Sequence, residues 1–220
     1  MTDKKALTTI LAGVLAATTM TGTAQSSIER MQTTEKSTSR IRPHLFYDLP
    51  FGVKGYTFIE FYDDGSSYYA KTGLTKKITD HLDARVDVID ISSATDQIGL
   101  GLEYKIPTGE KTLAKVKAMP VYFGFDGKYV KSKAVMGFYY HQKIHVPILK
   151  DASVVAFGEI DLAKKGGPTW SYGELHVQKS LKDYVLGIGA DLKSDGDITP
   201  HPELSIKLGY VFGHKYDSKK

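Results

Sequence analysis

Two closely spaced pairs of residues in the second half of the chain could support hydrolytic chemistry. Glu159 and Asp161 are two residues apart, as are Glu174 and His176, and in a β-strand this spacing places both members of a pair on the same face. A carboxylate beside an imidazole can support a general base, so an acid–histidine hydrolase site is one hypothesis. Ser171 is a candidate nucleophile, but no Gly-x-Ser-x-Gly motif surrounds it. The alternative is an interior filled with compensating charges.

Metal and cofactor chemistry has little support in the sequence. His141 and His145 share one face of an expected strand, but this spacing separates them by about 13 Å, too far to bind one metal ion. The chain contains no phosphate-binding loop, zinc-ligand spacing or calcium loop. We therefore predict no metal and no cofactor.

Composition excludes several classes of protein. The 220 residues carry a formal charge of +4, and the lysines and arginines are spread along the chain, so we do not expect a nucleic-acid partner. The absence of cysteine excludes a disulfide framework and a thiol nucleophile. A mean hydropathy of -0.24 excludes a helical membrane protein. It is compatible with a membrane β-barrel, in which only every second residue must be apolar.

The first 43 residues predict two segments outside the folded domain. Lys4 and Lys5 precede an apolar run over 6–17, and small residues lead up to Ala24, which is the order found in secretory signal peptides. We predict a cleaved signal peptide over 1–24, with a short buried helix as the alternative. Residues 25–43 are rich in Ser, Thr, Glu, Gln and Arg and predict a flexible polar tail.

From residue 44 onward, apolar residues recur at every second position between short turns, which predicts an all-β domain over 44–213 and a polar tail over 214–220. Short turns make consecutive strands antiparallel, and a long meander normally closes into a barrel. Pro120 lies within one of these strands and requires a β-bulge there. The expected strands, ten in number, are Leu45–Tyr62, Ser67–Thr79, Leu82–Ser92, Gln97–Pro107, Thr112–Phe125, Lys128–Val146, Ala152–Ala163, Thr169–Ser180, Tyr184–Lys193 and Pro202–Gly213.

Each expected strand has one apolar face and one face of charge and glycine. In a soluble barrel or sandwich the apolar face would point inward, whereas in a transmembrane barrel it would meet lipid. Tyrosines near strand ends favour the membrane, because such rings suit the water–lipid boundary. The expected aromatic belt comprises Tyr68, Tyr104, Tyr122, Trp170, Tyr172, Tyr184, Tyr210 and Phe212. The expected lumen-lining charges are Arg85, Asp87, Glu103, Lys105, Lys115, Lys117, Lys131, Lys133, Asp191 and Lys207.

The segment from Tyr56 to Phe212 resembles the small outer-membrane β-barrel proteins of Gram-negative bacteria. The resemblance depends on the leader, the series of hairpins and the last strand, 204–212, which alternates apolar residues and ends in an aromatic; in that class the aromatic is usually the final residue, whereas here 213–220 follow. It implies an antiparallel up-and-down transmembrane barrel in the outer membrane. It further implies contact with outer-membrane lipid and insertion by the barrel-assembly machinery.

Three functional hypotheses follow from the sequence. The first is an outer-membrane barrel with a structural role or a narrow channel for small solutes or ions. The second is a barrel-embedded hydrolase that uses the acidic and histidine residues named above. The third is a secreted soluble β-barrel that binds a small apolar ligand.

Overall fold

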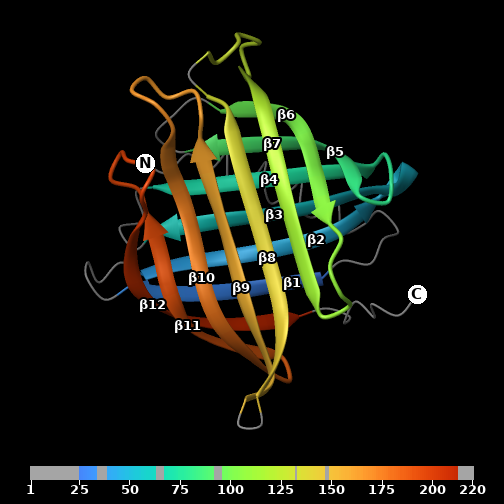
Figure 1. Ribbon diagram of the computed structural model, residues 1–220, viewed down its shortest axis with the longest axis vertical. Coiled ribbons are helices and arrows are strands. Elements are labelled where there is room, and N and C mark those ends of the chain that lie inside the picture. The colour runs from blue at the N-terminus through green and yellow to red at the C-terminus, as the bar shows by residue number, and fades with distance from the viewer. Residues whose placement is uncertain are drawn as a thin grey trace.

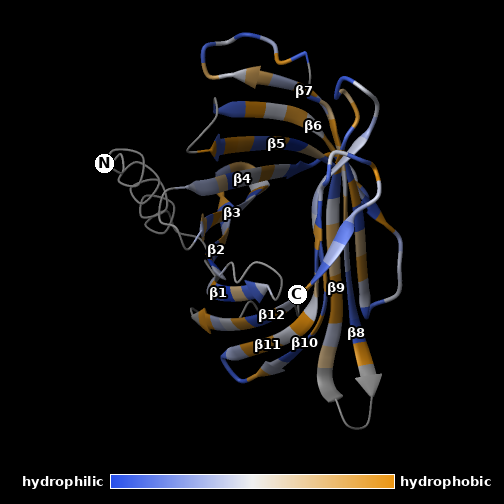
Figure 2. Ribbon diagram, turned by 90° about the vertical axis from the view of Figure 1, so that its left-hand side faces the viewer, coloured by the Kyte–Doolittle hydropathy of each residue, from blue (hydrophilic) through white to orange (hydrophobic). Residues whose placement is uncertain are grey.

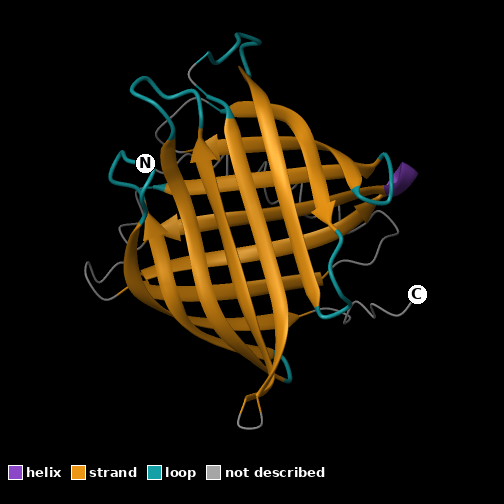
Figure 3. Cartoon of the chain, in the orientation of Figure 1, coloured by secondary structure: helices purple, strands orange, loops and turns teal. Residues whose placement is uncertain are grey.

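The computed structural model describes residues 25–33, 39–62, 67–91, 96–131, 133–146 and 149–212. The predicted signal peptide over 1–24 and the predicted tail over 214–220 lie outside these ranges. Twelve antiparallel strands form a closed barrel in which each strand pairs with its neighbours in sequence and β1 pairs with β12 (Figures 1 and 3). The elements are β1 (Gln25–Thr33), β2 (Ser39–Leu49), the short turn η1 (Pro50–Gly52), β3 (Val53–Tyr62), β4 (Tyr68–Lys77), β5 (Leu82–Ile91), β6 (Gln97–Ile106), β7 (Thr112–Gly124), β8 (Val135–Val146), β9 (Leu149–Asp161), β10 (Thr169–Leu181), β11 (Tyr184–Lys193) and β12 (His201–Phe212).

The prediction of ten strands is therefore wrong by two. The expected strand Leu45–Tyr62 is divided by η1, where Phe51 adopts a positive φ of 65° and reverses the chain. Within the expected polar tail over 25–43, residues 25–33 instead form β1 and residues 39–43 form the first part of β2. β1 pairs with β2 on one side and with β12 on the other. β1 has polar residues on both faces and so lacks the alternation of a half-buried strand. It forms because the barrel seam offers its backbone partners on both sides.

The strands cross one another in two walls. β8, β9 and β10 run steeply across the front of the barrel, whereas β2, β3 and β4 cross behind them at a large angle (Figure 1).

The connections differ between the two ends of the barrel. At one end, the short-turn end, strands are joined by η1 and by residues 78–81, 107–111, 147–148 and 182–183. At the other, the long-loop end, the connections are residues 34–38, 63–67, 92–96, 125–134, 162–168 and 194–200.

The apolar face of the sheet points outward. Along β6 and β12 every second side chain is a large apolar residue that remains about half exposed, and the bands of alternating hydropathy are visible along the strands in Figure 2. Charged side chains such as Asp87 and Asp191 are instead fully buried inside the barrel. A soluble barrel would have the opposite arrangement. The sequence-based alternative of a soluble barrel with an apolar interior is therefore wrong.

Two irregularities in the ladder lie next to predicted belt residues that face inward. The register between β6 and β7 shifts between Leu100 and Leu102, where Met119 and Pro120 on β7 lie opposite the single residue Gly101 on β6. The bulge therefore contains the proline, as predicted. Beyond the bulge Tyr122 faces the interior and is fully buried. A second shift lies between Trp170 and Tyr172 on β10. Tyr172 faces inward by regular alternation, because inward-facing Glu174 is two residues away with no irregularity between them. Neither tyrosine belongs to an outer belt.

The other predicted belt residues have different positions. Tyr104, Tyr184 and Tyr210 are exposed on the outer face, where the last two rings meet edge to face. The hydroxyl of Tyr68 donates a hydrogen bond to Asp90. The ring of Trp170 is buried beside Phe138, and its Nε1 donates to the carbonyl of Leu192. The side chain of Phe212 lies outside the described part of the structure.

Candidate functional site: the barrel lumen

Most of the predicted lumen charges lie inside the barrel and are paired there. On the wall formed by β5, β6 and β7, Arg85 contacts Asp87 at 2.7 Å and also Glu103. Further pairs on this wall are Lys115–Glu103 and Lys105–Asp83, each at 2.7 Å. Because these partners come from the same strand or from neighbouring strands, the pairs coat one wall and do not cross the lumen.

Two of the predicted lumen lysines lie outside the strands. Lys131 is exposed in the connection between β7 and β8, so its prediction as a lumen residue is wrong. Lys133 follows it in the same connection, but its Nζ lies 4.8 Å from the centre of the Tyr122 ring, a cation–π geometry. This contact holds Lys133 at the inner face of the long-loop end.

One ion pair joins opposite walls of the barrel. Lys71 on β4 and Glu159 on β9 are not sheet neighbours, yet the Nζ–Oε1 distance is 2.6 Å. Lys117 on β7 also contacts Glu159, and both lysines contact Asp87, at 3.3 Å from Lys71 and 3.1 Å from Lys117. The four side chains form a network that we call the Lys71 bridge.

A second bridge joins β2 to β10. The guanidinium of Arg42 lies 2.7 Å from Glu174 across the lumen and also contacts Glu60 on the neighbouring strand β3. Its NH2 donates a hydrogen bond of 2.7 Å to the hydroxyl of Tyr172, and its charge lies 5.5 Å from the centre of the Phe58 ring. We call this set the Arg42 bridge. The planar guanidinium of Arg42 has partners on several sides. Arginine can make such contacts in several directions, whereas the single ammonium of lysine could not make all of them.

Further charges extend the Arg42 bridge along the lumen. Arg40 contacts both Glu60 and Asp191 on β11. Lys207 on β12 lies 3.4 Å from Glu174 and 3.1 Å from Glu29 on β1. These partners leave Glu174 surrounded by cations. The charged groups of this half of the lumen therefore compensate one another.

Glycines on the inner face make room for these long side chains. A Cβ atom built at Gly73 would lie 2.6 Å from an Arg85 nitrogen, and one built at Gly99 would lie 2.6 Å from the ring of Tyr122. A real Cβ cannot approach this closely, so the inward side chains need glycine opposite them. The glycine-rich polar face of the sequence corresponds to this crowded interior.

The predicted hydrolase residues are separated by the fold. Glu159 belongs to the Lys71 bridge, whereas Asp161 accepts a backbone hydrogen bond from Ala163 at the long-loop end. Glu174 and His176 do approach each other, with 3.7 Å between Oε2 and Nδ1. Ser171, near the start of β10, is exposed.

A different serine, not singled out from the sequence, lies next to this histidine. The Oγ of Ser205 on β12 is 2.8 Å from His176 Nε2, and both residues are buried. His141 is half-buried on β8, and the side chain of His145 lies outside the described part of the structure.

Sequence reasoning missed the residues that form the cross-lumen contacts from β2. Arg40 and Arg42 were assigned to the polar tail, although they alternate with Ile41 and Pro43 as strand residues do. Lys71 lies in an expected strand but was not identified as a lumen charge. Its contact across the lumen depends on Glu159, which is distant in sequence, and no local sequence pattern predicts such a pair.

In the described ranges, no group of three or more His, Cys, Asp or Glu side chains could hold a metal ion. Within the same ranges the structure forms no helix that is long and apolar enough to cross a membrane.

Comparison with known proteins supports the fold. Neither a protein-family model nor a curated protein matches the sequence. Among solved structures, the KdgM porin aligns with a TM-score of 0.57 and 9% identity, covering 86% of this chain and 99% of its own. The NanC porin aligns with a TM-score of 0.58 at 9% identity and the same coverage. The chain has the fold of an outer-membrane porin. Because the identity is so low, the likeness concerns the fold alone.

Proposed function

We propose that this protein resides in the outer membrane and that its barrel is a narrow channel for small hydrophilic solutes. The observation that carries the proposal is the direction of the two faces of the sheet. The apolar face points outward, where it suits lipid, and the charged face lines the lumen with paired charges. The porin fold supports the same reading. Outer-membrane lipid would contact the outer face, and insertion would require the barrel-assembly machinery.

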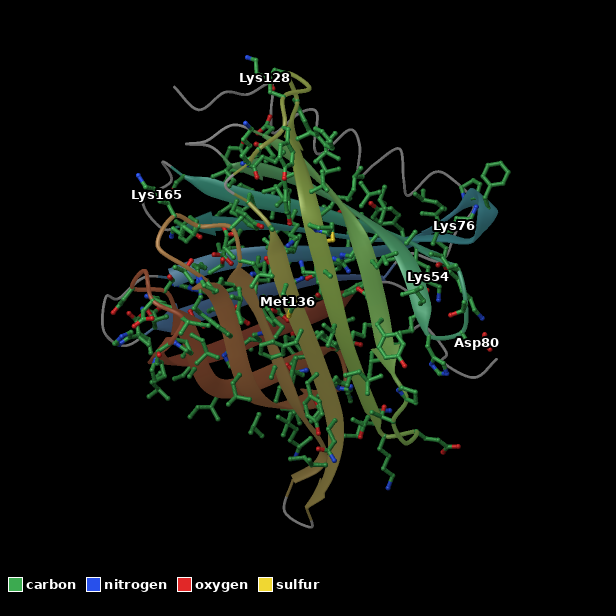
Figure 4. The ribbon with its side chains drawn as sticks, turned by 45° about the horizontal axis from the view of Figure 1, so that its top comes forward. Lys54, Lys76, Asp80, Lys128, Met136 and Lys165 are labelled. Carbon is green, nitrogen blue, oxygen red and sulfur yellow. The ribbon has the colours of Figure 1, made fainter. Side chains whose placement is uncertain are left out.

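The lengths of the connections favour one orientation. Outer-membrane barrels have short periplasmic turns and longer extracellular loops, so the short-turn end would face the periplasm. Lys54, Lys76 and Asp80 lie together at that end, far from Lys128 and Lys165 at the long-loop end, and Met136 lies between them (Figure 4). The long-loop end would be the solute entrance from outside the cell.

The two bridges are the basis for calling the channel narrow. Lys71–Glu159 and Arg42–Glu174 each join opposite walls, so a solute must displace a bridging side chain or pass beside it. Buried charges are costly to leave unpaired. We therefore expect small polar solutes to pass, and large or apolar ones to be excluded.

A solved complex of the KdgM porin contains disordered oligogalacturonate, an acidic oligosaccharide. In this chain, Arg40 and Arg42 each already contact two carboxylates. The lumen arginines are therefore compensated, and we do not propose a polyanionic saccharide as the solute.

The test combines a folding assay with conductance. A membrane barrel should migrate differently on SDS gels when unheated and when boiled, and the purified protein should give small ohmic steps in planar bilayers. The double variant K71Q/E159Q should give larger steps, because it removes the charge pair of one bridge. A heat-modifiable barrel that conducts neither as wild type nor as the double variant would be a structural barrel, and the channel proposal would be wrong.

The contact between Ser205 and His176 favours a second candidate function, a barrel-embedded hydrolase. Its nucleophile would be Ser205, its base His176 and its acid Glu174. The burial of all three residues and the contacts of Glu174 with Arg42 and Lys207 weigh against it. Covalent labelling by a fluorophosphonate, lost in S205A and H176A, would support the hydrolase; equal labelling of wild type and variants would exclude it.

A further inference from the structure

We propose that the Lys71 bridge makes the channel selective for small zwitterionic solutes over neutral ones and over ions of a single sign. This inference rests on the proposed channel function and names its solute class. It follows from the position of Lys71 and Glu159 on opposite walls, with 2.6 Å between their charged atoms.

A solute that passes between Lys71 and Glu159 must separate this pair. Once separated, Lys71 keeps Asp87 and Glu159 keeps Lys117 as a partner, but each has lost one charged contact. A neutral solute carries no charge that could replace the lost partner of either Lys71 or Glu159. An anion compensates only Lys71 and a cation only Glu159, so one side remains under-compensated in a poorly hydrated interior.

A zwitterion compensates both sides at once. Its carboxylate accepts hydrogen bonds from the Lys71 ammonium, and its ammonium donates hydrogen bonds to the Glu159 carboxylate. Hydrogen bonds between ionised groups are the strongest of the ordinary kinds. The separated state of the bridge therefore has its lowest free energy when a solute with both charges occupies it.

The two bridges differ in how easily they could open. Glu159 is the more accessible carboxylate, with 26% of its side chain exposed, and Lys71 has a flexible stem that can swing aside. Arg42 is instead held by Glu60, Tyr172 and Phe58. We therefore expect the Lys71 bridge to open as a solute passes, and the Arg42 bridge to stay closed.

The experiment is a swelling assay on liposomes that contain the full-length protein, corrected for empty liposomes. The probes are glycine as the zwitterion, glycolamide as a neutral molecule of similar size, sodium glycolate as the anion and ethanolammonium chloride as the cation. In wild type we expect glycine to enter roughly fivefold faster than glycolamide, which corresponds to the net value of about one ordinary hydrogen bond. In K71Q/E159Q the ratio should fall to near one, while glycolamide enters faster.

The matched control is K193Q/E203Q. Lys193 and Glu203 also form an ion pair, but they lie on neighbouring strands of one wall, so the glycine preference should persist. If wild type admits glycine and glycolamide equally, the selectivity proposal is wrong while the channel stands. If no probe enters through either wild type or K71Q/E159Q, the channel itself is wrong.

Discussion

Lys71 on β4 and Glu159 on β9 contact each other across the barrel, with 2.6 Å between Nζ and Oε1. The two residues are distant in sequence and lie on opposite walls, so their contact spans the lumen at that level. Arg42 on β2 and Glu174 on β10, which are 2.7 Å apart, form a second contact across the lumen.

Neutralising one side of the Lys71 bridge should set the sign of ion selectivity. In E159Q, Lys71 and Lys117 share only Asp87, so the lumen gains positive charge and we expect the reversal potential in a KCl gradient to shift toward chloride. K71Q should shift it toward potassium. Lys77→Gln, in an exposed pair with Asp80, serves as the control and should leave it unchanged. Shifts of the same sign in E159Q and K71Q would contradict the bridge.

Removing the guanidinium of Arg42 should destabilise the barrel. Arg42→Ala leaves Glu60 and Glu174 without one of their cations inside the lumen, and breaking a buried ion pair costs about 3–5 kcal/mol. We expect a lower heating temperature for loss of the compact band on SDS gels. Arg42→Lys should be intermediate, since it keeps the charge but loses the planar fork. An unchanged transition in Arg42→Ala would mean that Arg42 does not make these contacts.

The inner glycines should differ in their tolerance of a methyl group. At Gly99 a Cβ would lie 2.6 Å from the Tyr122 ring, whereas at Gly209 the nearest atom, Glu29 Cγ, would be at 3.4 Å. Gly99→Ala should therefore displace Tyr122 and lower the yield of refolded, heat-modifiable barrel. Gly209→Ala should refold like wild type. Equal yields would show that Tyr122 does not pack over Gly99.

Two similarly exposed isoleucines can test whether the outer face meets lipid. Ile206 on β12 is 55% exposed, and Ile198 in the connection before that strand is 49% exposed. In a membrane barrel, Ile206→Arg should destabilise by about 2–4 kcal/mol if the residue lies near the bilayer centre, while Ile198→Arg should have little effect. Urea unfolding from lipid vesicles would measure the difference. Equal tolerance of both substitutions would contradict a membrane-embedded outer face.

The sequence by itself determined the strands from β4 onward and the polarity of their two faces, except that the expected strand Lys128–Val146 begins only at Val135. Alternation of the kind seen in Leu100, Leu102 and Tyr104 is a local property, because successive side chains of a strand point to opposite sides whatever the strand pairs with. The same locality allowed Pro120 to predict a bulge.

Only the tertiary structure decided which strands close the barrel, which rings face inward and which charges meet. β1 is polar on both faces, so its place depends on the free edges of β2 and β12. Tyr122 faces inward because a single inserted residue reverses the alternation beyond it. Lys71 and Glu159 meet because barrel closure brings opposite walls together, and that distance is set by the pairing of every strand between them and by no pattern within either one.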